Sequence, residues 1–218
     1  MEKTRKSRLC IPAGILLILS YIITLGSNIF LTYRSVNTSG TTDFFGFMRS
    51  YLLNAEVIIF LAAFMFLGIL LIACQHKVIT PIAITAIFFL ECYVLGEQMN
   101  RIIALRTYAL IPTAIPTLIA EVAWFLSGLF CFFYLADVSR FTGLRKIWHL
   151  PALIECLNIP VVLFSSIRFV LTAVKSGVDV LADVPNLIIA SAAPFVTTAL
   201  TAAAMFLMMR WFAYPYKK

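Results

Sequence analysis

Charged residues are scarce in this chain of 218 residues: Asp, Glu, Lys and Arg together make up 12%, against about 25% in an average soluble domain. Apolar residues make up 62%, which is more than a water-soluble fold of this size can cover. The low charge content therefore excludes an ordinary soluble domain and predicts an integral membrane protein. We interpret the net charge of +7 as cations that flank membrane segments, rather than as a nucleic-acid-binding surface.

Residues and motifs typical of enzymes are also few. His76 and His149 are the only histidines, and both fall at the ends of apolar stretches, so we interpret them as interface residues rather than as haem ligands in a bundle core. The sequence contains no HExxH, Walker A or GxGxxG motif, which excludes the simplest metalloprotease, ATPase and dinucleotide-binding sites. No catalytic residue, metal site or cofactor is predicted, and an enzymatic function is open but disfavoured.

The cysteines do not form a framework either. The five are Cys10, Cys74, Cys92, Cys131 and Cys156. None is in CxxC spacing, and four lie inside or at the edge of apolar stretches. We therefore interpret them as small buried hydrophobic residues rather than as disulfide partners or zinc ligands.

What the chain does contain is six long apolar stretches. They cover approximately residues 9–33, 51–75, 78–96, 108–136, 150–174 and 184–212. Each reaches the length of about 17–25 residues that crosses the hydrocarbon layer. The first follows a basic segment, and its apolar core exceeds the about 7–15 residues of a cleaved signal peptide, so we expect it to remain as the first helix. The predicted fold is all-α: one transmembrane domain, residues 1–218, built as a bundle of about six helices.

The distribution of cations predicts the orientation of the bundle. If both termini are cytoplasmic, the inner segments carry Lys3, Arg5, Lys6, Arg8, Lys77, Arg140, Arg145, Lys146, Arg210, Lys217 and Lys218. The outer segments then carry only Arg34, Arg49, Arg101, Arg106 and Lys175. Because cytoplasmic segments are enriched in Lys and Arg, this bias predicts a cytoplasmic N-terminus and C-terminus in the cell membrane. The longest outer segment, residues 34–50, has an apolar second half that we expect to lie on the membrane surface.

Ionisable residues inside the apolar stretches are the candidate site. An acid near mid-bilayer costs about 2.5–3.5 kcal/mol on insertion scales, so its side chain usually faces protein or water. The topology predicts Glu56 and Glu91 near the outer ends of their helices, Glu121 near mid-membrane and Arg168 in the outer half of the fifth helix. We predict that these four residues bind a ligand in a polar cavity open to the outside. Glu155 is expected near the inner end of the fifth helix.

Two alternatives remain for these charges. They could form structural ion pairs between helices, such as Arg168 with Glu121 or Glu91, or they could relay protons. Glu155 and Arg168 are thirteen residues apart on one helix, so at about 100° per residue they point to nearly opposite faces and do not pair. Prolines inside the predicted spans favour bent helices beside a cavity, although proline is also common in membrane helices generally.

Three functions fit these observations. The first is a small transporter, or the ligand-binding or permease subunit of a transport complex. The size and predicted helix count of the chain are similar to those of the vitamin-binding subunits of energy-coupling-factor transporters. The first helix of those subunits typically carries Ala-xxx-Ala spacing, which residues 11–18 lack, so no family is assigned. The alternative is a sensory or regulatory membrane domain that signals to a separate cytoplasmic partner. A lipid-modifying enzyme is the least favoured. Expected partners are the lipid bilayer, a possible partner subunit and a small molecule or ion.

Overall fold

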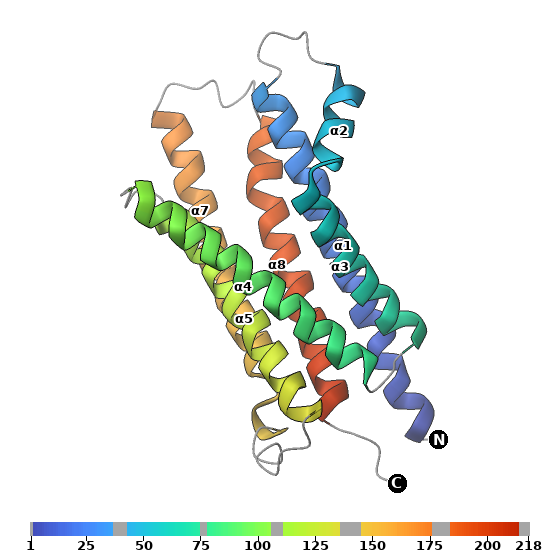
Figure 1. The fold of residues 1–218 in the computed structure, drawn as a ribbon. Coiled ribbons are helices and arrows are strands. Elements are labelled where there is room, and N and C mark those ends of the chain that lie inside the picture. The colour runs from blue at the N-terminus through green and yellow to red at the C-terminus, as the bar shows by residue number, and fades with distance from the viewer. Residues whose placement is uncertain are drawn as a thin grey trace.

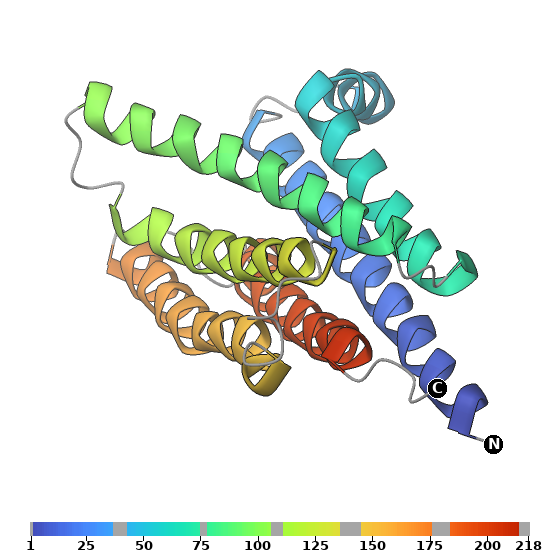
Figure 2. The ribbon, with the colours of Figure 1, turned by 60° about the horizontal axis from the view of Figure 1, so that its bottom comes forward.

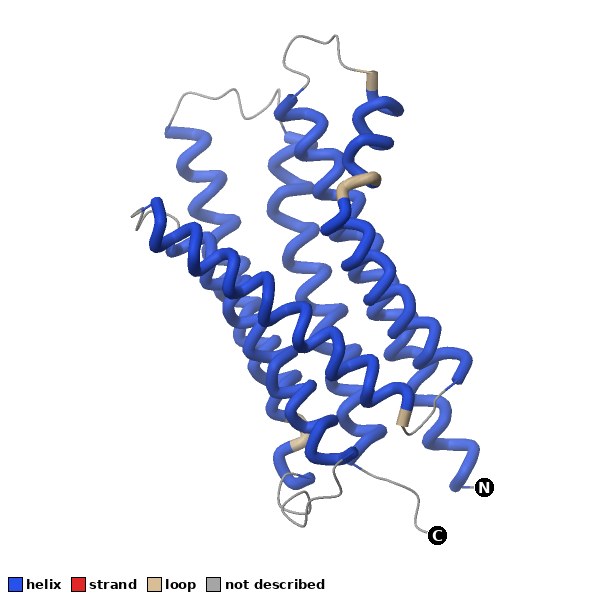
Figure 3. Tube along the Cα trace, in the orientation of Figure 1, coloured by secondary structure: helices blue, strands red, loops and turns tan. Residues whose placement is uncertain are grey.

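The computed structural model describes residues 2–36, 43–74, 78–105, 111–135, 145–175 and 184–213. Within these ranges every regular element is helical, as Figure 3 shows. The α-helices are α1 (Glu2–Val36), α2 (Phe44–Leu52), α3 (Ala55–Ile69), α4 (Ile79–Leu105), α5 (Ile111–Leu135), α7 (Leu150–Lys175) and α8 (Val184–Ala213). A π-helical turn, Leu70–Cys74, continues α3, and a 3₁₀ turn, Arg145–Ile147, precedes α7. The prediction of an all-α fold is confirmed.

Local sequence signals explain where several helices begin. Proline is the second or third residue of four helices, at Pro81 in α4, Pro112 in α5, Pro151 in α7 and Pro185 in α8. Proline suits the first turn because the backbone N–H that it lacks has no partner inside the helix there. The start of α2 is set differently, by the Asp43 carboxylate, which accepts hydrogen bonds from the backbone N–H of Phe45 (3.3 Å) and Gly46 (2.8 Å).

Helix length and hydropathy identify a multi-pass membrane protein. Four helices of the described chain are long and apolar enough to span a membrane, over Leu9–Arg34, Ile115–Leu135, Leu150–Thr172 and Asn186–Ala213. A fifth span results if Phe44–Leu52 and Val57–Ala73, which meet at 72°, are counted together. The apolar part of α4, Ile79–Tyr93, is shorter. Six crossings, cytoplasmic termini and a surface position for α2 stay predictions.

The long helices run alternately up and down and form a closed ring. α1 packs against α8, α8 against α7, α7 against α5, α5 against α4, α4 against α3, and α3 against α1. The start of α1 and the end of α8 lie at the same end of the bundle (Figure 1). Figure 2 shows α4 running past α5, against which it packs.

The apolar core occupies one end of this ring. Its buried residues come from the first half of α1, α4 and α7, from the second half of α3, α5 and α8, and from the π-helical turn after α3. They include Cys10, Leu67, Leu71, Ile84, Cys131, Met205, Met208, Met209 and Phe212. Because successive helices alternate in direction, all of these segments meet where α1 begins and α8 ends. We call this region the packed end.

Close helix contact at the packed end depends on glycine. A Cβ atom on Gly14 of α1 would lie 2.5 Å from the backbone oxygen of Gly68 in α3. A Cβ atom on Gly68 would in turn collide with the side chain of Ile18. The absence of side chains on both residues therefore lets α1 and α3 cross with their backbones nearly in contact, as small residues do at membrane helix interfaces.

Candidate functional site

A cavity of about 390 Å³ lies inside the ring, beside the packed end. All six long helices contribute to its wall. The polar lining residues are Ser20, Tyr21, Thr24, Glu91, Thr117, Glu121, Glu155, Asn158, Thr197, Thr198 and Thr201. The apolar lining includes Leu17, Phe60, Phe64, Trp124 and Val162. We call this space the acidic cavity, because three glutamates face it and none of its described lining residues is Lys, Arg or His.

The three glutamates come from different helices and lie close together. Glu91 is on α4, Glu121 on α5 and Glu155 on α7. The carboxyl groups of Glu91 and Glu121 are close neighbours, and Glu155 lies within electrostatic reach of Glu91. The cavity therefore brings acidic side chains from three helices into one electrostatic neighbourhood.

Several buried oxygens of the cavity wall have unused hydrogen-bonding capacity. Among the described residues, Glu121 Oε2, Glu155 Oε2 and Asn158 Oδ1 have no hydrogen-bond partner. The exposed fractions of these side chains are 4%, 3% and 3%. Leaving a buried polar atom without a partner costs about 1–3 kcal/mol. Three such atoms around one cavity mark a place where a ligand with hydrogen-bond donors gains binding energy.

Side-chain hydrogen bonds fix the helices that form this wall. Ser20 of α1 hydrogen-bonds with the Thr201 hydroxyl (2.8 Å) and donates to the Thr197 backbone oxygen (3.1 Å), both on α8. Asn158 of α7 donates through Nδ2 to the backbone oxygen of Pro116 on α5 (2.8 Å). The bonds therefore join α1 to α8 and α5 to α7 at the level of the glutamates.

Aromatic rings form the side of the cavity toward the packed end. Tyr21 and Phe64 stack with ring centroids 5.3 Å apart and planes at 15°. Trp124 meets Phe64 edge-on, also at 5.3 Å. Phe64 and Trp124 belong to the buried core, so the packed end holds these rings in place and presents an apolar surface beside the carboxyl groups.

The predicted site residues do not all meet here. Glu91 and Glu121 line the cavity together. Arg168 is exposed on α7 and is not among the lining residues, and within the described residues no ion pair joins it to either glutamate. Glu56 lies in the first turn of α3, and its side chain is outside the described part of the chain. The cavity therefore carries acidic groups without the arginine that the sequence placed among them.

The position of Glu91 along its helix differs from the expectation. Glu91 was expected near the outer end of a helix that stops at residue 96, but α4 continues to Leu105, so Glu91 lies near its middle. The continuation contains Glu97, Gln98, Asn100 and Arg101, polar residues that end an apolar stretch but do not end a helix.

Sequence reasoning missed Glu155 and Asn158 as site residues. Glu155 was expected near the inner end of its helix and apart from the other acids, yet it lines the same cavity. The pattern that could have identified them is the spacing of Glu155, Asn158 and Val162, at i, i+3 and i+7. This spacing places all three residues on one face of α7. Sequence reasoning also did not include Thr197, Thr198 and Thr201 of α8 in the site, and all three line the cavity.

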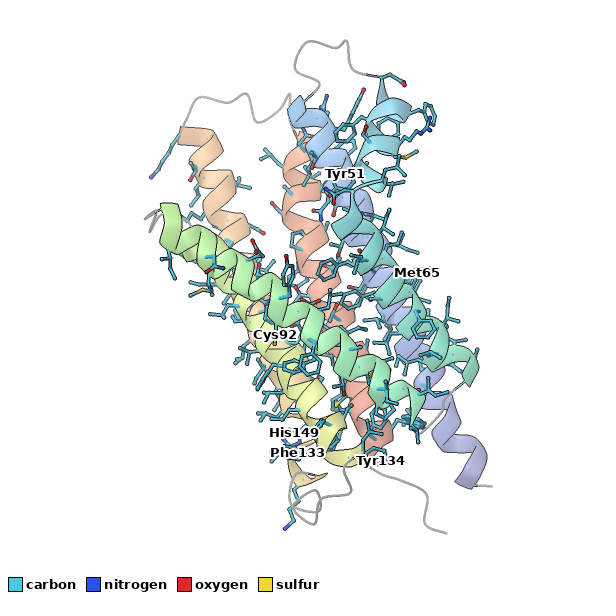
Figure 4. The ribbon with its side chains drawn as sticks, viewed as in Figure 1. Tyr51, Met65, Cys92, Phe133, Tyr134 and His149 are labelled. Carbon is cyan, nitrogen blue, oxygen red and sulfur yellow. The ribbon has the colours of Figure 1, made fainter. Side chains whose placement is uncertain are left out.

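Other candidate groups lie outside the cavity. No group of three His, Cys, Asp or Glu side chains in the described chain could hold a metal ion. The described cysteines are free, with Cys10 and Cys131 buried and Cys92 and Cys156 exposed, so the expectation of buried thiols holds for two of these four. His149 lies at the packed end, as do Phe133 and Tyr134, whereas Tyr51 lies toward the opposite end (Figure 4).

No protein-family model matches this chain, and no curated protein or solved structure is significantly similar to it.

Proposed function

We propose that this chain is a small membrane transporter, or the ligand-binding subunit of a transport complex, and that the acidic cavity is its solute site. The observation that carries the proposal is a cavity of about 390 Å³ to which all six long helices contribute, with buried glutamate and asparagine oxygens that have no partner among the described residues. Ligand sites in helix bundles lie between facing helices, and their volumes are typically about 300–1,000 Å³.

The position of the cavity supports access from one side. The packed end closes the bundle where α1 begins and α8 ends, so a solute would approach from the opposite end. With the cytoplasmic termini that the cation distribution predicts, this approach is from outside the cell. Pro116 and Pro194 lie inside α5 and α8 and line the cavity, and prolines within helices often mark the bends at which transport proteins move.

The first test is a thermal-stability screen of the purified protein in lipid nanodiscs against inorganic ions and small metabolites of each charge. A ligand at 100 times its Kd stabilises the folded protein by about 2.7 kcal/mol. We expect stabilisation of the wild type and of Glu97→Gln, whose side chain is exposed on the same helix as Glu91, and its loss in Glu121→Gln.

Uptake into proteoliposomes then separates the possible roles. Uptake of the stabilising solute supports a transporter, whereas binding without uptake supports a ligand-binding subunit or the sensory alternative. If no solute stabilises the wild type and Glu121→Gln only lowers its melting temperature, the proposal is wrong and the buried carboxyl groups have a structural role.

A further inference from the structure

We infer that the acidic cavity selects a small organic cation: a primary ammonium group bound by Glu121, Glu155 and Asn158, with its apolar part against Phe64 and Trp124. This inference rests on the proposed function, because it concerns the same cavity, and it adds the chemical class of the solute.

The sign of the ligand charge follows from the lining residues. Three carboxyl groups face the cavity, and no Lys, Arg or His among the described lining residues compensates them. A buried carboxylate is costly unless a positive charge or hydrogen-bond donors accompany it. A bound cation supplies both and favours the ionised carboxylates, whereas an anion would be repelled by them and a neutral solute supplies no positive charge.

The hydrogen-bonding pattern distinguishes among cations. Three buried atoms of the cavity wall have no hydrogen-bond partner among the described residues: Glu121 Oε2, Glu155 Oε2 and Asn158 Oδ1. When the two carboxyl groups are ionised, all three atoms are acceptors. Flipping the side-chain amide of Asn158 would exchange Oδ1 for Nδ2 and lose the hydrogen bond to Pro116. Nδ2 donates to the Pro116 backbone oxygen, which can only accept, so Oδ1 could not replace it. A primary ammonium carries three N–H donors and no acceptor, which matches this set.

The size and apolar side of the cavity favour an organic ammonium over a bare metal ion. A volume of about 390 Å³ far exceeds that of a dehydrated ion, and no described group of three ligating side chains could hold a metal. Phe64 and Trp124 lie beside the acids and are themselves 8% and 4% exposed. Rings of this kind bind the apolar part of a ligand and attract its cationic head through their faces.

The test compares matched pairs of probes by titration calorimetry on the detergent-purified full-length chain. Ethylamine, butylamine and benzylamine are titrated beside ethanol, butanol and benzyl alcohol, which keep the apolar part and lack the charge. Butyrate and benzoate supply the opposite charge, and sodium and potassium chloride supply inorganic cations. We expect at least one amine to bind at least tenfold more tightly than its alcohol and its carboxylate, with no comparable binding of the inorganic cations.

Variants then locate the binding. The affinity for the amine should fall at least tenfold in Glu121→Gln and in Glu155→Gln, and it should be unchanged in Glu97→Gln. The amine-to-alcohol ratio is measured on the wild type, so the inference can be refuted even if a cavity variant fails to fold. Equal binding of alcohol and amine, tighter binding of a carboxylate, displacement by sodium or potassium at equal concentration, or no binding of any amine would each overturn it.

The outcome also separates this inference from the proposed function. A neutral or anionic solute that stabilises the protein, and that requires Glu121, would leave the cavity as a solute site while refuting the organic cation. Failure of every solute in the stability screen and of every amine in calorimetry would refute both.

Discussion

The two halves of α1 differ sharply in what surrounds them. At the packed end, a Cβ atom on Gly14 would lie 2.5 Å from the backbone of α3. In contrast, no atom of the described residues lies within 4 Å of the corresponding position on Gly26, twelve residues further along the helix. α8 shows the same contrast, since Met205 and Met209 are fully buried while Phe195 and Val196 are each 40% exposed. Tight packing is therefore concentrated at one end of the bundle, and the polar cavity begins where it stops.

This division separates the part that stabilises the fold from the part that can bind a solute. Close-packed side chains leave no room for a ligand, whereas helices with fewer buried contacts can adjust their spacing at lower cost. The comparison predicts that equivalent substitutions in the two halves have different effects on stability.

The largest expected effect is at Met205, a fully buried core side chain of α8. Met205→Ala leaves a cavity at the packed end and should lower the free energy of unfolding by about 2–5 kcal/mol. The matched control is Met99→Ala on α4, whose side chain is 46% exposed and whose loss should change stability by less than about 0.5 kcal/mol. Unfolding in mixed detergent and SDS micelles measures both. Equal losses for the two variants would show that the packed end is not the more stable half.

The second prediction concerns two glycines of α1. Gly14→Ala places a methyl group against the backbone of α3 and should destabilise the protein by about 1–3 kcal/mol. Gly26→Ala makes no new contact and favours the helix, so it should stabilise by about 0.5–1 kcal/mol. If the contrast along α1 is correct, the same micelle assay will report changes in unfolding free energy of opposite sign for the two variants. A neutral Gly14→Ala would mean that α1 and α3 separate easily.

The smallest effect is expected at the hydrogen bonds of the cavity wall. Ser20→Ala removes the bonds from α1 to Thr201 and Thr197 of α8, and interhelical hydrogen bonds in membranes contribute only about 0.6 kcal/mol on average. Ser27→Ala is the control, because its hydroxyl donates within α1 to Thr24 and its loss should be close to neutral. If Ser20→Ala lowered the free energy of unfolding as much as Met205→Ala, the contrast between the cavity wall and the packed end would be wrong. The wall would then stabilise the fold as much as the core.

The helices were predictable from sequence because an apolar stretch of sufficient length can satisfy its backbone in lipid only by folding as a helix. The helix ends were less predictable. α4 continues past residue 96 through polar residues up to Leu105, since hydropathy reports contact with lipid rather than the helical conformation. The length of α4 is what moves Glu91 to mid-helix.

The cavity was predictable only in part. The spacing of residues along a helix determines which of them share a face, but it does not determine which faces of different helices meet. Glu121 and Glu91 were chosen for their depth, and they do line one cavity. Arg168 was chosen for the same reason and is exposed, because α7 turns its Glu155 and Asn158 face inward. That choice depends on how α7 packs between α5 and α8, which no local pattern along α7 encodes.

Glu91 and Glu121 belong to α4 and α5, which follow one another in the chain and pack together. Their carboxyl groups can therefore meet as soon as this hairpin enters the bilayer, before α7 supplies Glu155 and α8 supplies its threonines. An acid that faces lipid alone costs about 2.5–3.5 kcal/mol on insertion scales. We therefore expect contact between Glu91 and Glu121 to lower that cost while the later helices are still being made.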